Sequence, residues 1–246
     1  NPIEKKKLIE QTIKRNRTGT LPNRIFECFR INRGCVAFFK PSTAKYIYKK
    51  YGAKKILDPT MGWGGRMLGA WSLGLDYIGN DLNRNMMDSY EKMKNCLSSN
   101  QETREHVQNK NSTITTIWEN CLKLELNDID YDFVLTSPPY VNLEEYENMT
   151  RFESEKSFYE KFLIPLITRC IWYCRRNGKV CFNISPKMYK LATEKYGLQK
   201  CDSEEDLLQQ LGNRKRKNVD KIYIWNVNSK LEKMKREYRT KKLLEK

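Results

Sequence analysis

The sequence predicts an α/β protein built on a doubly wound, mostly parallel sheet, and three observations favour this class. Short apolar runs rich in β-branched residues alternate with longer stretches of helical period. A glycine-rich turn joins one such run to the next helical stretch, as in a βαβ unit. A later run stops at two consecutive prolines, which cannot continue an interior strand. Strands separated by helices produce a sheet with helices on both faces.

The elements are expected in a regular order along the chain. Ser42 is a candidate N-cap for a helix through Tyr51, because its hydroxyl can accept a hydrogen bond from the first helical turn. The remaining elements are strand 55–57, helix 66–74, strand 77–81, helix 85–99, strand 113–118, strand 131–135, helix 157–175, strand 179–184 and strand 222–227.

The charge of the chain is concentrated at its two ends. The 246 residues carry a net charge of +16, from 46 Lys and Arg against 30 Asp and Glu. Residues 1–50 hold 13 basic and 3 acidic side chains, and residues 214–246 hold 13 and 4. A near-neutral middle between basic ends predicts a polyanionic partner; the alternative is that the basic ends only aid solubility.

We expect three parts in the chain. Residues 1–35 form a basic N-terminal arm, residues 36–227 form the α/β domain, and residues 228–246 form a basic helix or tail. Segments 141–157 and 186–220 are possible insertions for substrate recognition. The spacing of Leu231, Met234 and Tyr238 in the last part leaves a solvated helix or a dimer contact open.

Several classes of protein are excluded by composition. Cys170 and Cys174 are the closest of eight scattered cysteines, and His106 is the only histidine, so we expect no metal site. No apolar run approaches the roughly 18 residues of a membrane span, and no signal peptide is recognisable. Reduced cysteines predict an intracellular protein, cytoplasmic or nuclear.

The glycine-rich turn, residues 58–65 with the sequence Asp-Pro-Thr-Met-Gly-Trp-Gly-Gly, is a candidate cofactor site. Glycines let the backbone approach a ligand closely. Asp58, at the strand end, could hold a charged amine or its water. Asp81 ends the next strand about 20 residues later, where an acid accepts hydrogen bonds from both ribose hydroxyls. A plain tight turn and a strand-end cap are the alternatives. No lysine follows the glycines as in a Walker motif, which argues against nucleotide hydrolysis. The G-x-G-x-x-G pattern of nicotinamide-dependent enzymes is also absent.

The segment Ser137-Pro138-Pro139-Tyr140 is the most specific pattern in the chain. Two prolines remove two N–H donors and leave carbonyls that only accept. An exocyclic amino group of a base is a poor nucleophile, because its lone pair is delocalised into the ring, and acceptors for both hydrogens draw it out of conjugation. The Ser137 oxygen and the Pro138 carbonyl can provide them, and Tyr140 offers a ring on which a flipped-out base can stack. The alternative is a proline turn with a buried tyrosine.

Together these residues resemble the DNA amino-methyltransferases of the class I S-adenosylmethionine-dependent fold. Residues 58–64 are similar to the family's cofactor motif Asp-Pro-Phe-x-Gly-x-Gly, with Thr60 in place of phenylalanine. Residues 136–140 match its catalytic motif, and residues 39–42 resemble a Lys-Pro segment that lines the methionine pocket. Asn120 stands where the family often has an aspartate near the cofactor adenine. The resemblance covers about residues 36–185, with a final strand near 222–227.

The resemblance implies a Rossmann-like fold, S-adenosyl-L-methionine as cofactor and two sets of site residues. The implied catalytic residues are Ser137, Pro138, Pro139 and Tyr140. The implied cofactor-binding residues are Lys40, Pro41, Asp58, Pro59, Thr60, Gly62, Gly64, Asp81, Leu82, Asn120 and Thr136.

The implied activity is methyl transfer to an exocyclic amino group of a base in DNA, as in restriction-modification. Serine at the first catalytic position favours cytosine N4 over adenine N6, because family members with Ser there are often cytosine N4 enzymes. The alternatives are an RNA base or a protein amide as substrate, or a non-catalytic DNA-binding subunit of a methyltransferase complex. Little sequence is available for target recognition, which predicts a partner subunit, a homodimer or relaxed sequence specificity.

Overall fold

The computed structural model describes residues 39–99, 111–140, 152–207 and 221–228, together with Glu10 and Thr20. The chain divides into two compact units, residues 1–38 and 39–246, and every element below belongs to the second. The predicted arm lies outside the described residues except for Glu10 and Thr20. Residues 141–151, 208–220 and 229–246, which include parts of the expected recognition segments and the C-terminal tail, also lie outside them.

The second unit is built on a seven-stranded sheet whose order is β3-β2-β1-β4-β5-β7-β6. In this order the strands are Ile114–Ile117, Asp76–Asn80, Lys55–Asp58, Phe133–Thr136, Lys179–Ile184, Lys221–Asn226 and Ser203–Asp206. The first five run parallel, β7 is antiparallel to β5, and β6 is antiparallel to β7. This confirms the predicted mostly parallel sheet. The order reverses between β1 and β4, and ligands bind at the carboxyl ends of the strands at such a point.

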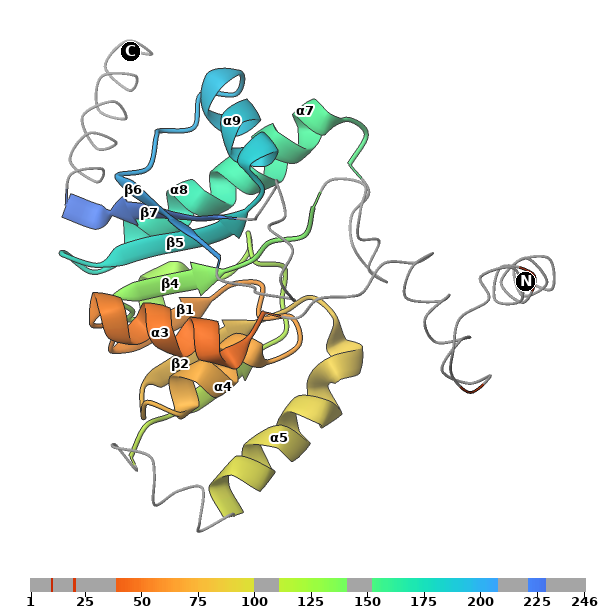
Figure 1. Cartoon of the computed structure of the whole chain (residues 1–246), viewed down its shortest axis with the longest axis vertical. Coiled ribbons are helices and arrows are strands. Elements are labelled where there is room, and N and C mark those ends of the chain that lie inside the picture. Colours follow the sequence, from red (N-terminus) through yellow and green to blue (C-terminus); the bar gives the residue numbers. More distant parts are fainter. Residues whose placement is uncertain are drawn as a thin grey trace. The chain divides into compact units, whose positions relative to one another are not determined.

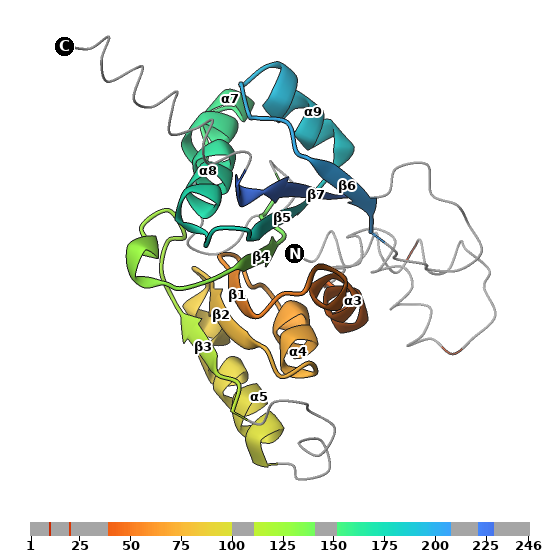
Figure 2. The ribbon, with the colours of Figure 1, turned by 90° about the vertical axis from the view of Figure 1, so that its left-hand side faces the viewer.

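Helices cover both faces of the sheet (Figures 1 and 2). One face carries α3 (Pro41–Tyr51), α4 (Gly65–Trp71) and α5 (Met87–Ser99), and the other carries α7 (Glu155–Phe158), α8 (Ile164–Tyr173) and α9 (Pro186–Glu194). Short 3₁₀ turns occur at η1 (Arg84–Met86) and η2 (Leu126–Asp128), and η3 (Tyr159–Leu163) is a π turn. Among the described helices, none has the length and hydrophobicity needed to cross a bilayer.

Successive strand residues supply two separate cores, one on each face. In β4, Phe133 and Leu135 pack with α3 and α4, while Val134 packs with α8. In β1, Ile56 belongs to the core on the α3 and α4 side, and Leu57 belongs to the core on the α8 side. All five side chains are at most 1% exposed. Burial on both faces is typical of a parallel sheet and explains why these strands read as continuous apolar runs.

Helix α3 begins two residues earlier than predicted, and Ser42 is not its N-cap. Pro41 occupies the first turn, and Lys40 is the capping residue without a side-chain cap. Proline suits this position because its fixed φ is helical and its missing N–H would have no helical partner. Gly52, with φ 66°, ends the helix.

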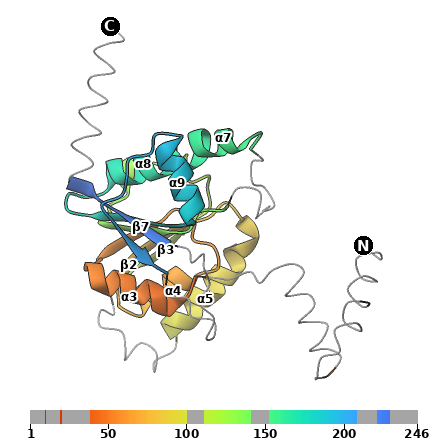
Figure 3. The same cartoon turned by 45° about the horizontal axis from the view of Figure 1, so that its top comes forward.

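Segment 186–206, expected as part of a recognition insertion, instead contains α9 (Figure 3) and the edge strand β6 (Figure 2). Strand β6 reads Ser-Glu-Glu-Asp and is mostly exposed. Charged side chains on an edge strand prevent pairing with other chains. The segment therefore completes the sheet, and residues 208–220 remain the undescribed part of that expected insertion.

Candidate active site

A pocket of about 470 Å³ lies at the carboxyl ends of β1 to β4, where the strand order reverses. It is lined by Pro59, Thr60, Gly62, Trp63, Asn80, Asp81, Leu82, Asn83, Met86, Glu119, Asn120, Cys121, Leu122, Ser137, Pro139, Phe152, Glu153, Ser157, Lys161 and Phe162. Its volume falls in the usual range for sites that bind small molecules and cofactors.

The glycine turn forms the floor of the pocket. Gly62 and Gly64 have φ of 57° and 82°, in the left-handed region that favours glycine. The Met61 N–H donates to the Asn80 carbonyl at 2.8 Å, and the Tyr90 hydroxyl donates to the Gly62 carbonyl at 2.8 Å. A Cβ at Gly62 would meet only open space, so the backbone here is open to a ligand. The turn is thus held rigidly with its backbone facing the pocket.

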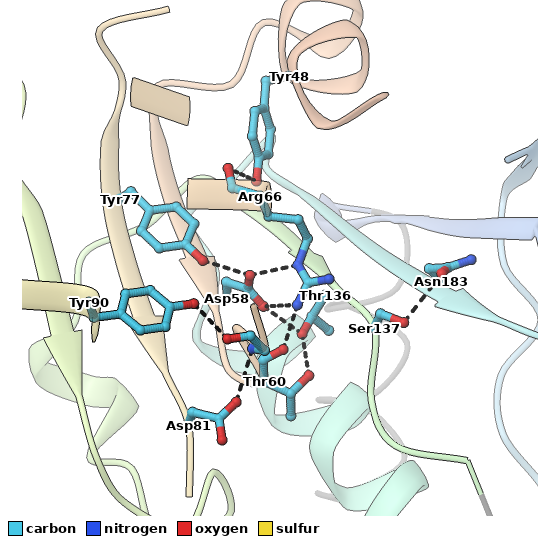
Figure 4. A network of polar contacts seen from close by, with 11 residues as sticks. Tyr48, Asp58, Thr60, Arg66, Tyr77, Asp81, Tyr90, Thr136, Ser137 and Asn183 are labelled. Atoms are coloured by element: carbon cyan, nitrogen blue, oxygen red, sulfur yellow. Dashed lines mark hydrogen bonds and ion pairs between the residues drawn. The ribbon is translucent and has the colours of Figure 1, made fainter. Parts of the chain in front are cut away.

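Asp81 is tied to this turn by its carboxylate. One carboxylate oxygen accepts the Gly62 N–H at 2.9 Å (Figure 4). The other accepts the Asn83 N–H, also at 2.9 Å. Burial raises the pKa of Asp81, and the two backbone N–H groups only partly oppose this rise. Each oxygen retains acceptor capacity, because a carboxylate oxygen has about two lone-pair sites. Asp81 therefore offers two fixed acceptors to a ligand in the pocket.

Asn80 is a pocket residue that sequence reasoning missed. Its amide donates to the Pro59 carbonyl at 3.1 Å and to the Glu119 carbonyl at 2.9 Å, and its oxygen accepts the Glu119 N–H at 3.1 Å. The side chain is fully buried. It joins the cofactor turn to the loop after β3 and so fixes the two sides of the pocket where Asp81 and Asn120 lie.

Asp58 does not line the pocket, in contrast to the expectation that it could hold a charged amine. Its carboxylate is fully buried and accepts from Arg66 Nε at 2.6 Å, Arg66 Nη2 at 3.2 Å, the Tyr77 hydroxyl at 2.7 Å and the Thr136 hydroxyl at 2.8 Å. A carboxylate has about four acceptor sites, so the protein's own donors take them all. Asp58 belongs to the scaffold beneath the site.

Lys40 and Pro41 of the Lys-Pro segment are also not among the residues that line the pocket. Lys40 and Pro41 form the start of α3. The Lys40 carbonyl accepts the N–H groups of Thr43 and Ala44, each at 3.1 Å. A Cβ added to Gly69 on α4 would come within 2.9 Å of the Pro41 carbonyl oxygen, so the start of α3 packs closely on α4. Since neither residue is among those that line the pocket, their contact with the methionine group of a cofactor stays a prediction.

The residues expected at the site divide into two groups. Those that line the pocket are Pro59, Thr60, Gly62, Asp81, Leu82, Asn120, Ser137 and Pro139. Those that do not are Lys40, Pro41, Asp58, Gly64, Thr136, Pro138 and Tyr140. Thr136 and Pro138 are buried beside the pocket, and Tyr140 is half-buried against the core on the α8 side.

Ser137 follows β4 directly and brings an oxygen to the pocket. Its hydroxyl donates to Asn183 Oδ1 at 3.3 Å, and the Asn183 amide donates to the Lys221 carbonyl at 3.2 Å. Asn183 is 4% exposed and lies at the end of β5. Because the single hydroxyl hydrogen is used in this bond, the Ser137 oxygen faces any further partner as an acceptor.

Part of the pocket lining comes from a helix with a π turn. The Ile164 N–H bonds to the Tyr159 carbonyl, five residues back, just before Pro165. Proline has no N–H and its ring would collide with the carbonyl four residues earlier in a regular helix, which explains the wider turn. Lys161 and Phe162 on this turn line the pocket. The sequence predicted a regular helix here, and Pro165 was the available signal.

The pocket fits S-adenosylmethionine by the chemistry of its lining. Asp81 presents fixed acceptors suited to ribose hydroxyls, the open backbone at Gly62 permits close approach, and apolar side chains of Leu82, Leu122 and Phe162 can enclose a heteroaromatic ring.

The fold and this site define a class I S-adenosylmethionine-dependent methyltransferase. A family model described as Eco57I restriction-modification methylase matches residues 42–237. The chain belongs to the Eco57I restriction-modification methylase family. The comparison with curated protein sequences gives no match.

Two solved structures share the fold. TrmN from Thermus thermophilus has a TM-score of 0.51 and 13% identity over 80% of this chain and 52% of its own. The S-adenosylmethionine-dependent methyltransferase NGO1261 from Neisseria gonorrhoeae has a TM-score of 0.50 and 12% identity over 78% of this chain and 75% of its own. This chain thus spans about half the length of TrmN.

Proposed function

We propose that this protein transfers a methyl group from S-adenosylmethionine to an exocyclic amino group of a base in DNA. The observation that carries the proposal is the position of Ser137-Pro138-Pro139-Tyr140. The segment leaves β4 at the carboxyl edge of the sheet, and Ser137 and Pro139 line the same pocket as Asp81 and the glycine turn. Acceptors for an amino group and the cofactor site therefore adjoin.

This chain needs no strong general base before the methyl group moves. When bound, the cofactor supplies an electrophilic methyl group on a sulfonium. The Ser137 oxygen, with its hydrogen directed to Asn183, and the Pro138 carbonyl accept from the two hydrogens of the amine. These acceptors draw the nitrogen lone pair out of the base ring, and such fixed dipoles are worth most where charge develops. As the amine nitrogen forms its bond to the methyl carbon, the bond from that carbon to sulfur breaks and S-adenosylhomocysteine leaves. The amine releases one proton to solvent only as it gains the methyl group.

Charge favours a nucleic acid over a protein as the substrate, and the family favours DNA among nucleic acids. The matching family is a restriction-modification methylase family, and the chain carries a net charge of +16. Lysine and arginine at both ends suit phosphates rather than base edges. Among the bases we favour cytosine N4 over adenine N6, because Ser137 stands at the first catalytic position.

The deciding experiment identifies the methylated nucleoside. The protein is incubated with tritiated S-adenosylmethionine and either DNA or RNA, and the polymer is digested to nucleosides. N4-methylcytosine in DNA is the expected product, and N6-methyladenine would keep the proposal while reversing the base preference. Label in RNA alone would reassign the polymer. No label in either would favour a non-catalytic subunit.

A reducing intracellular compartment, cytoplasmic or nuclear, is part of the proposal. The described cysteines are free thiols, and most of them are buried. Burial raises the pKa of Cys121 to about 12, and that of Cys174 likewise. Such thiols are protonated and unreactive, as structural core cysteines are.

Trp63 should report directly on occupation of the pocket. Its side chain is 62% exposed and lines the pocket, so a ligand that covers the indole should shift its emission to shorter wavelength. We expect titration with S-adenosylhomocysteine to produce this shift in the wild type. Trp63→Phe should abolish it and keep a ring at that position. Full retention of the shift in the variant would place the ligand elsewhere, because the four other tryptophans lie outside the pocket lining.

The C-terminal tail should supply affinity for DNA without sequence preference. Residues 229–246 hold eight basic and three acidic side chains, and a cut after Asn228 keeps its side-chain contacts with Asn177. Each lost phosphate contact should reduce the slope of log affinity against log salt by about 0.9. Deletion of 229–246 should weaken binding on all sequences and flatten the slope, as measured by fluorescence anisotropy at several salt concentrations. An unchanged slope would favour the alternative of a solvated helix or dimer contact.

A further inference from the structure

A closed ring of hydrogen bonds lies beneath the pocket and joins the cofactor turn to the strand that leads to Ser137 (Figure 4). Arg66 bonds Asp58 through Nε and Nη2, and its Nη2 also donates to the Thr60 carbonyl at 2.5 Å. The Thr60 and Thr136 hydroxyl oxygens lie 2.7 Å apart, and the Thr136 hydroxyl donates to Asp58 at 2.8 Å. Thr60 is thus held through both its carbonyl and its hydroxyl.

The direction of the hydroxyl chain follows from the number of hydrogens. Thr136 has one hydroxyl hydrogen, and it goes to the Asp58 carboxylate, which when ionised can only accept. Thr60 must therefore be the donor in the bond between the two threonines. The chain runs from Thr60 through Thr136 to Asp58, and the charge of the carboxylate strengthens it.

The position of this ring is more informative than its contribution to stability. Asp58 is fully buried and Arg66 is 4% exposed, and neither lines the pocket. Burial lowers the pKa of Arg66, but the charge and hydrogen bonds of Asp58, together with the nearby hydroxyls of Tyr77 and Tyr48, outweigh burial and raise the pKa overall, so the guanidinium stays charged. A buried ion pair is weak evidence for stability, and its best-attested use is to specify one arrangement among several.

We propose that Arg66, Asp58, Thr60 and Thr136 act together as positioning residues that fix the cofactor turn against the segment beginning at Ser137. Thr60 lines the pocket beside the glycine turn, and Thr136 precedes Ser137 directly. A bond between them sets the separation of the two halves of the site, one for the methyl donor and one for the target amine. The inference rests on the proposed function, because it assigns the ring a task in methyl transfer.

This assignment also explains the departure from the resembling cofactor motif. That motif has phenylalanine where this chain has Thr60. A phenyl ring could not donate to Thr136, so the ring of hydrogen bonds requires a hydroxyl at this position. The packing contact that phenylalanine would make is replaced here by a hydrogen bond to the catalytic strand.

The test uses threonine variants, because removal of one member of a buried ion pair threatens the fold itself. Thr136→Val keeps the shape and loses the hydroxyl, whereas Thr136→Ser keeps the hydroxyl. Thr193→Val on α9 makes the same change away from the pocket, where the hydroxyl bonds only to its own helix. Single-turnover rates at saturating cofactor, calorimetric affinity for S-adenosylhomocysteine and melting temperature are measured for each full-length variant and for Thr60→Val.

Thr136→Val should lower the rate of methyl transfer about 10- to 100-fold, because small misplacement of reacting groups is costly. Its cofactor affinity should change by less than about threefold. Thr136→Ser and Thr193→Val should stay near the wild-type rate. The double variant Thr60→Val with Thr136→Val should be no slower than the slower single variant, because the two share one bond.

Three results would overturn the inference. They are a wild-type rate for Thr136→Val, a lowered melting temperature with an unchanged rate per folded molecule, and additive losses in the double variant. Failure of the wild type itself to methylate any nucleic acid would overturn the proposed function, and the inference with it. The two failures are therefore separable, since the second appears without any variant.

Discussion

Ser137→Ala is expected to lower the single-turnover rate of methyl transfer about 10²–10³-fold, the usual loss when one preorganised contact to developing charge is removed. The side-chain oxygen is one of two proposed acceptors for the target amine, and Asn183 holds its hydrogen away. Cofactor affinity should stay near the wild-type value, because Ser137 is assigned to the amine and Asp81 to the cofactor. Calorimetry with S-adenosylhomocysteine checks that half of the expectation.

A matched control and a second position make this prediction decisive. Ser98→Ala, on the exposed face of α5, removes an equivalent hydroxyl and should leave the rate unchanged. Tyr140 lies beside the pocket and not in its lining, and its ring face is proposed to stack on the base. Tyr140→Ala should then lose about 1–3 kcal/mol of base stacking, whereas Tyr140→Phe should be mild. Equal damage in Phe and Ala would show that the hydroxyl matters. Wild-type transfer in all of these variants would make the segment a structural turn.

The sheet and the pocket floor were predictable because they depend on local patterns. Strand 179–184 coincides with β5, and the helix predicted to end at Ser99 does so. The glycine turn and Asp81 were located from spacing, since a strand, a turn and a helix fix where the next strand ends. Strand β6 was missed because its exposed Ser-Glu-Glu-Asp sequence carries no apolar alternation.

The scaffold of the site depended on contacts that no local pattern reveals. The pairing of Asp58 with Arg66 across the turn depends on the direction in which α4 leaves it. The bond between Thr60 and Thr136 joins residues 76 positions apart and requires β1 and β4 to be neighbours. Spacing within a motif therefore located the turn, but it could not distinguish an acid that faces the ligand from one that faces the core.

Asp81→Asn is expected to weaken cofactor binding roughly tenfold to a hundredfold, because hydrogen bonds to a charged acceptor contribute about 1.5–3 kcal/mol. The control is Asp88→Asn, which makes the same change of charge on the exposed start of α5 and should bind normally. Asp81 also supports the turn through Gly62, so loss of affinity alone does not distinguish contact from support.

A 2′-deoxy analogue of S-adenosylhomocysteine separates the two roles. If Asp81 accepts from the ribose hydroxyl, the analogue should bind the wild type more weakly than the normal ligand and should bind Asp81→Asn as well as the normal ligand does. The two changes would then be coupled in a thermodynamic cycle. Independent, additive losses would assign Asp81 to the support of the turn.

The pH dependence gives the same residue an independent signature. Burial raises the pKa of Asp81, against the weaker effect of the Asn83 and Gly62 N–H groups, and only the ionised form accepts from both hydroxyls without donating. Cofactor affinity of the wild type should therefore fall on acidification through this raised pKa, earlier than an exposed aspartate would allow. The contribution of Asp81 to folding stability has the opposite sign. A carboxyl whose folded-state pKa lies above its unfolded value stabilises the fold at low pH, and this stabilisation is lost as the pH rises through the folded-state pKa.

Calorimetric titrations over about pH 4–8 should show the fall in affinity for the wild type and a flatter profile for Asp81→Asn. Identical profiles would exclude Asp81 as the titrating group.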